Sequence, residues 1–162
     1  MHPSVALSLL VVFLASCTSK TVIPLPGPSF VKAPRECPFG LGLREGNQIK
    51  EGSDLIRLMN DHIPVWLPSG FGLSGAWDAS YGTWGVWTDR SCRTVTVTFS
   101  PDHSGPSSWT TDYDKPHACG NQAMGMGECI GYSVMASGGS LNVQTIGLSR
   151  SDADHVIQSI RI

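Results

Sequence analysis

The stretch Arg93-Thr-Val-Thr-Val-Thr-Phe-Ser100 alternates apolar and hydroxyl side chains. Successive side chains of a β-strand point to opposite faces of the sheet, so one face of this strand is apolar and the other carries hydroxyls. Val95, Val97 and Phe99 form the apolar face, and Thr94, Thr96 and Thr98 form the other. An apolar face must be covered by a second layer. Residues 93–100 therefore predict a strand in a layered domain that contains a sheet.

Further strand signals lie on both sides of this stretch and are separated by turn residues. Residues 79–81 and 101–106 read as turns, residues 119–129 as a Gly-rich loop, and Ser137-Gly138-Gly139 as a hairpin turn. Between them we expect strands over residues 72–78, 82–89, 108–113, 130–136 and 140–146. Consecutive strands joined by short turns predict an antiparallel sheet.

A helix is expected at each end of this run of strands. Ser53-Asp54 is an N-cap signal, apolar residues follow at helical spacing, and Pro64 is a stop signal, which predicts a short amphipathic helix over residues 54–62. Ser149-Arg150-Ser151-Asp152 precedes a second helical pattern that runs to Ile160. The predicted fold class is therefore α+β: a single small domain with an antiparallel sheet of about five or six strands, one helix before it and one C-terminal helix.

Composition narrows the function classes. The chain has 162 residues, 41% hydrophobic and 15% charged, and its 11 Lys+Arg against 13 Asp+Glu give a net charge of −2. That length allows one domain with at most a tail. A near-neutral chain without a basic stripe is not expected to bind nucleic acid.

The N-terminus carries an export signal. Val5–Ala15 is an apolar run of about 16 Å in helical form, too short to span a bilayer and typical of a signal-peptide core. Leu14-Ala15-Ser16-Cys17 follows and resembles the lipobox of bacterial lipoproteins, although Met1-His2-Pro3-Ser4 lacks the usual Lys or Arg. The resemblance implies cleavage before Cys17 and acylation of its thiol. Two acyl chains anchor stably, so the protein is expected on a membrane surface, outside the cytoplasm, and on the outer membrane if the source is Gram-negative.

The chain then divides into three parts. Residues 1–16 are the predicted signal peptide, residues 17–36 a lipidated Cys with a Pro-rich tether, and residues 37–162 the α+β domain. Thr21–Pro34 contains four Pro, which favours an extended spacer over a proline-rich ligand for a partner groove. Trp66–Ile162, with Leu67-Pro68-Ser69-Gly70-Phe71 before the strands and Ala153-Asp-His-Val-Ile-Gln-Ser-Ile160 after a hairpin, resembles small extracytoplasmic bacterial domains of the DUF4367 type. That resemblance implies a sheet domain and no catalytic residues.

Four cysteines remain once Cys17 is acylated. Cys37, Cys92, Cys119 and Cys129 form an even set in an exported chain, which predicts two disulfides with three connectivities open. The short Gly-rich loop favours Cys119–Cys129, and Cys37–Cys92 then remains. A zinc site is disfavoured because no Cys-x-x-Cys spacing occurs. The other metal hypothesis is Cu(I) held by His117, Met124 and Met126, weighed against Met side chains that fill core gaps.

The sequence contains no clear catalytic motif. Gly-x-Ser-x-Gly is absent, and a Cys92 or Cys119 nucleophile beside His103 or His117 would be consumed by disulfide formation. His62 and His155 show no metal-ligand spacing, and Asp112 with Asp114 reads as a solvated face. No cofactor is expected.

Tryptophan supplies the candidate binding residues. Trp77, Trp84 and Trp87 lie in adjacent predicted strands, where they would either pack in the core or stack on a glycan or protein partner of the envelope. Trp84 and Trp87 differ in parity, so at most one of them shares a face with Trp77. The sequence thus predicts a non-catalytic binding or scaffolding lipoprotein. An envelope hydrolase and an envelope-sensing signalling lipoprotein are the alternatives.

Overall fold

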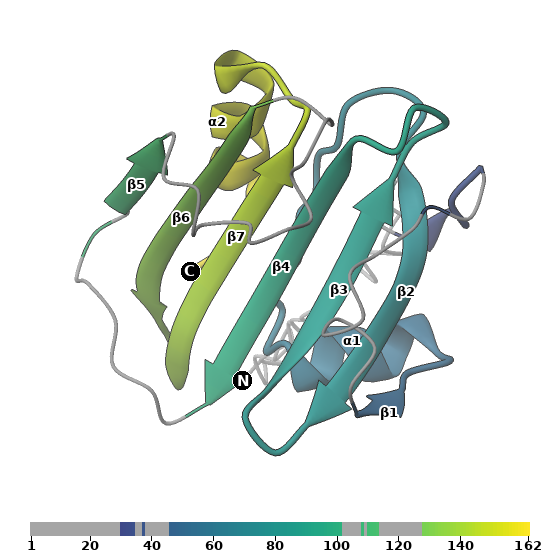
Figure 1. The fold of residues 1–162 in the computed structure, drawn as a ribbon. Helices are drawn as coiled ribbons and strands as arrows, with labels where there is room; N and C mark the ends of the chain where they lie inside the picture. The colour runs from purple at the N-terminus through teal and green to yellow at the C-terminus, as the bar shows by residue number, and fades with distance from the viewer. Residues whose placement is uncertain (1–29, 35–36, 38–45, 102–107, 109, 114–127) are drawn as a thin grey trace, which may run out of the picture.

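The computed structural model describes residues 30–34, 37, 46–101, 108, 110–113 and 128–162. Its centre is an open antiparallel sheet in the order β1-β2-β3-β4-β7-β6-β5 (Figure 1). The strands are β1 (Asn47–Gln48), β2 (Gly72–Ala79), β3 (Gly82–Thr88), β4 (Thr94–Pro101), β5 (Thr110–Tyr113), β6 (Cys129–Ala136) and β7 (Gly139–Ile146). The helices are α1 (Gly52–Leu58) and α2 (Arg150–Ser159). The predicted α+β class is confirmed, with the two-residue β1 added to the expected strands.

Both helices cover the same face of the sheet (Figure 1). The apolar face of β4 lies against them, because Val95, Val97 and Phe99 belong to one buried cluster with residues of α1 and α2. The helices contribute Leu55, Ala153, Val156 and Ile157 to this cluster. The alternation in residues 93–100 therefore predicted both the strand and its core-facing side.

The opposite face is also partly apolar. Trp77, Trp84 and Val86 form a second, smaller buried cluster. Trp77 pairs directly with Trp84 across β2 and β3, whereas Trp87 pairs with Val95 and joins the main core. The parity argument is confirmed: only Trp84 shares a face with Trp77.

Helix α1 differs from its predicted bounds. It begins at Gly52 after the N-cap Glu51, which makes no side-chain cap hydrogen bond, so the Ser53-Asp54 signal does not cap it. It ends before Asn60 and Asp61, whose φ angles of 49° and 64° are left-handed and stop the helix before Pro64. The predicted span of residues 54–62 was therefore shifted and too long. Helix α2 begins as expected, because the Ser149 hydroxyl accepts the backbone N–H of Asp152 at 3.1 Å.

Residues 30–34 lie against the outer side of β2. Lys32 forms a parallel bridge with Leu73, and the backbone N–H of Ala33 donates to the Leu73 carbonyl at 2.9 Å. Phe30 packs on the main core. The end of the predicted tether thus contacts the sheet and covers part of the β2 backbone that the two-residue β1 leaves unpaired.

Candidate functional site

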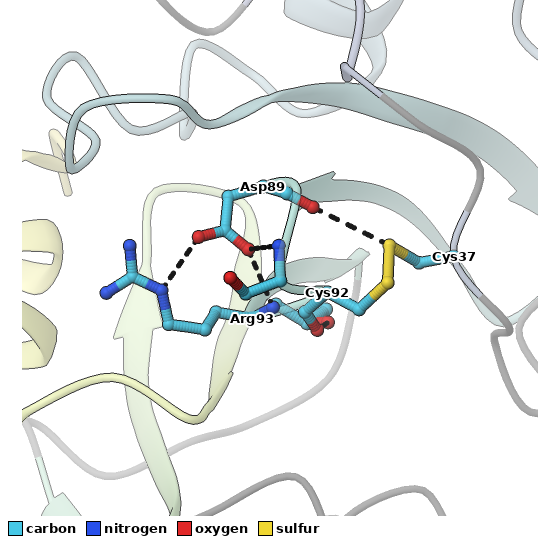
Figure 2. Close-up of polar contacts among 6 residues, drawn as sticks. Cys37, Asp89, Cys92 and Arg93 are labelled. Atoms are coloured by element: carbon cyan, nitrogen blue, oxygen red, sulfur yellow. Dashed lines mark hydrogen bonds and ion pairs between the residues drawn. A yellow bond between two sulfur atoms is a disulfide. The ribbon is translucent and has the colours of Figure 1, made fainter.

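A disulfide joins Cys37 to the tight turn between β3 and β4. Figure 2 shows the sulfur–sulfur bond of this bridge. The two Cα atoms are 5.5 Å apart, and both residues are buried. Cys92 sits in this turn with a left-handed φ of 62°. The Cys37 sulfur lies 3.7 Å from the Asp89 carbonyl oxygen, a packing contact because a disulfide sulfur carries no hydrogen. The predicted Cys37–Cys92 pair is confirmed.

The carboxylate of Asp89 organises the same turn (Figure 2). One oxygen accepts the backbone N–H groups of Ser91 and Arg93, each at 2.9 Å, and the other accepts Nε of Arg93 at 2.8 Å. The Arg93 guanidinium lies 5.4 Å from the centre of the Phe71 ring. Since both oxygens of Asp89 are used within the turn, this ion pair holds the backbone to which Cys92 is attached.

The remaining predicted cysteines are only partly described. Cys129 is disulfide-bonded. Its predicted partner Cys119 and the predicted lipidation site Cys17 lie outside the described residues, as do His117, Met124 and Met126 of the copper hypothesis. Within the described ranges, no group of three or more His, Cys, Asp or Glu residues could hold a metal ion. In the same ranges neither helix is long and apolar enough to cross a membrane.

The three candidate tryptophans are buried. Trp77 is 8% exposed, Trp84 is 2% exposed and Trp87 is fully buried. Aromatic surface is instead offered by Tyr81, which is 48% exposed and stacks on Trp84 with ring centroids 5.5 Å apart. Half-buried Trp66 stacks on His155 at 3.9 Å. The three candidate rings thus contribute mainly packing.

The histidines of the described chain serve packing and hydrogen bonding. His62 is 3% exposed, and its Nδ1 donates to the carbonyl of Arg161 at 2.6 Å. The ring of His62 is thus a buried, hydrogen-bonded group. His155 stacks on Trp66 at the surface. Among the described residues, neither of these two rings hydrogen-bonds to a Ser or Cys side chain. His103, Asp114 and the side chain of Asp112 lie outside the described part.

A pocket of 310 Å³ opens where α1, β1 and the end of β2 meet. Its lining combines an apolar part, Ile49 and Leu58, with the amides of β1 and four charged side chains. The charged residues are Lys50 after β1, Asp54 and Arg57 on α1, and Asp78 on β2. Asn47 is the register partner of Asp78 in the pairing of β1 with β2, and both line the pocket together with residues of α1.

The four charges of the pocket differ in how well they are compensated. Arg57 pairs with Asp54 at 3.4 Å, but their side chains are 69% and 52% exposed, so this ion pair is weak. Half-buried Asp78 accepts a hydrogen bond from the Thr83 hydroxyl and has no cationic partner among the described residues. Lys50 likewise has no ion pair within the described part of the chain. The pocket therefore offers one cation and one carboxylate for a ligand.

No motif in the sequence indicates this pocket. Its residues come from three segments without a motif, residues 47–50, helix α1 and the end of β2, and they meet because α1 packs beside the β1–β2 edge. No protein-family model, curated protein or solved structure matches this chain. The resemblances to lipoproteins and to DUF4367-type domains remain predictions.

Proposed function

We propose that this chain is a lipid-anchored, extracytoplasmic lipoprotein whose disulfide-stapled domain has a non-catalytic binding role in the cell envelope. The observation that carries the proposal is the buried Cys37–Cys92 disulfide. Disulfides persist in oxidising compartments and are rare in the cytosol, so the bridge supports export. The Leu14-Ala15-Ser16-Cys17 sequence supplies the matching export and acylation signal.

The pocket supports binding over catalysis. Among the described residues its lining contains no Ser, Cys or His, so it holds no hydroxyl or thiol nucleophile of Ser or Cys and no imidazole base. Outside the pocket, the ion pair of Asp89 with Arg93 holds a turn. A concave site with an apolar part and a few convergent polar groups is the usual form of a ligand pocket.

The acylation is tested by metabolic labelling with an alkyne analogue of palmitate in the native host. We expect label on the wild-type chain and none on Cys17→Ser, because only the Cys17 thiol can carry the diacylglycerol thioether. Cys37→Ser is the matched control, since it removes a different cysteine and leaves the signal sequence unchanged. Equal label on wild type and Cys17→Ser would contradict the proposal.

A further inference from the structure

We propose that the pocket between α1, β1 and β2 binds a small zwitterion with an aliphatic body, such as a free amino acid or the unblocked end of a short peptide. This inference rests on the binding role proposed above, and it does not depend on the lipid anchor. It names the chemical class of the ligand from the charges, the apolar lining and the size of the pocket.

The charge balance favours a ligand with both signs. Lys50 and Arg57 oppose Asp54 and Asp78, so the lining is neutral overall. A simple anion would be repelled by the two carboxylates, and a simple cation by Lys50 and Arg57. A ligand with one ammonium and one carboxylate group gains attraction from both sets.

Two of these groups are available without breaking an existing ion pair. Lys50 has no ion pair among the described residues, and it is placed to receive a carboxylate. Asp78 is half-buried and accepts a hydrogen bond from the neutral Thr83 hydroxyl. No described cation pairs with it, so an ammonium group would supply a counter-charge. The exposed Asp54–Arg57 pair is weak enough to rearrange when a ligand enters.

The apolar lining and the size limit the rest of the ligand. Ile49 packs against the main core and contributes, with Leu58, the aliphatic part of the pocket. A volume of 310 Å³ lies at the small end of ligand pockets, which run from about 300 to 1,000 Å³. An amino acid or dipeptide with small aliphatic side chains fits this space, and a longer chain would have to extend into solvent.

The inference is tested by titrating the full chain, solubilised in detergent with its disulfides intact, with L-alanyl-L-alanine. Calorimetry measures the affinity, and backbone amide shifts in NMR spectra locate the site. N-acetyl-alanyl-alanine lacks the ammonium charge, and alanyl-alanine amide lacks the carboxylate. We expect saturable binding of the free dipeptide, with shifts at residues 47–58 and 78, and binding weaker by about tenfold or more for each blocked peptide.

Two variants test the charges of Lys50 and Asp78 one at a time. Lys50→Gln should weaken binding of the free dipeptide by about tenfold and leave binding of the amide form, which has no carboxylate, unchanged. Asp78→Asn should weaken binding of the free dipeptide by a similar factor and leave binding of the acetylated form, which has no ammonium, unchanged. Lys32→Gln and Asp61→Asn, at exposed positions outside the pocket, are the matched controls and should bind as wild type. Blocked peptides that bind as tightly as the free one, shifts elsewhere in the chain, or no saturation would each overturn the inference. The labelling of Cys17 is measured separately, so loss of this ligand leaves the lipoprotein proposal standing.

Discussion

Thr145 places a hydroxyl group inside the core of the sheet. It is fully buried on β7 between Val95 and Ile130, and its Oγ1 has no hydrogen-bond partner among the residues that the structure describes. A buried hydroxyl without a partner costs free energy of desolvation that folding does not recover. Thr94 is also buried, but its hydroxyl donates to the Cys92 carbonyl at 3.0 Å.

These two threonines give opposite predictions for the same substitution. We expect Thr145→Val to raise the free energy of unfolding by about 1 kcal/mol, because it removes an unsatisfied group and keeps the shape of the side chain. Thr94→Val should lower it by about 1 kcal/mol, because it removes a hydrogen bond and leaves a carbonyl unpaired. Urea unfolding of both variants measures the difference, and a destabilising Thr145→Val would show that its hydroxyl has a partner.

At the residue scale the sequence predicted which side chains face the core but not how their polar atoms are satisfied. The alternation in residues 93–100 placed Val95 and Phe99 correctly, because parity along a strand is fixed by backbone geometry. The pairing of Asp78 with Thr83 depends on which strands become neighbours and in which register. That information lies outside any local stretch of sequence.

In β2 and β3, two tryptophans fold back over glycines on their own strands. A Cβ at Gly85 would lie 2.6 Å from the Trp87 ring, and one at Gly75 would lie 2.4 Å from the Trp77 ring. Residues two apart on a strand share a face, so each glycine leaves the space that the next tryptophan occupies. The two rings cover their glycines on opposite faces of the sheet, because Trp77 and Trp87 belong to different clusters.

Two substitutions test whether the Trp87 ring needs the space that Gly85 leaves. Gly85→Ala should lower the free energy of unfolding by about 2 kcal/mol, because the Trp87 ring must leave its place in the packed core. In a Trp87→Leu background, the loss in free energy of unfolding caused by Gly85→Ala should be smaller by about 1 kcal/mol, because the tryptophan ring is absent. Equal costs in the two backgrounds, measured by thermal unfolding, would show that the ring does not need the space above Gly85.

One side chain, that of Ser149, caps the N-terminus of helix α2. Ser149→Ala removes the hydroxyl that accepts the Asp152 N–H, and we expect a loss of about 1 kcal/mol. Ser151→Ala is the control, because Ser151 is exposed and sits within the helix, where Ala is favoured. A cost at Ser151 equal to that at Ser149 in denaturant unfolding would contradict the capping role.

At the element scale, the sequence predicted strands better than the first helix. Alternation and turn residues marked the six longer strands, whereas α1 is only seven residues long. A helix that short is held by the packing of Leu55 and by the left-handed Asn60 and Asp61 after it. Neither effect is visible in an N-cap signal or in apolar spacing.

For the whole molecule, the Cys37–Cys92 disulfide closes a long loop of the chain. The two cysteines are 55 positions apart, and in the chain-entropy model such a loop contributes about 4 kcal/mol. Cys37→Ala and Cys92→Ala should therefore each lower the melting temperature strongly, because small domains have about 5–15 kcal/mol of stability. The double variant should be no less stable than the worse single variant, since each removes the same bond. Additive losses would mean that the two side chains stabilise the domain independently.

The protein that we propose is an exported, oxidised domain held to the membrane by a lipid on Cys17. The most direct test is the intact mass of the chain purified from membranes of its native host, without reduction. We predict the mass of residues 17–162 with a diacylglyceryl group on Cys17, less four hydrogen atoms for the Cys37–Cys92 disulfide and the disulfide of Cys129. A mass equal to residues 1–162 with every thiol reduced and no lipid would contradict the account.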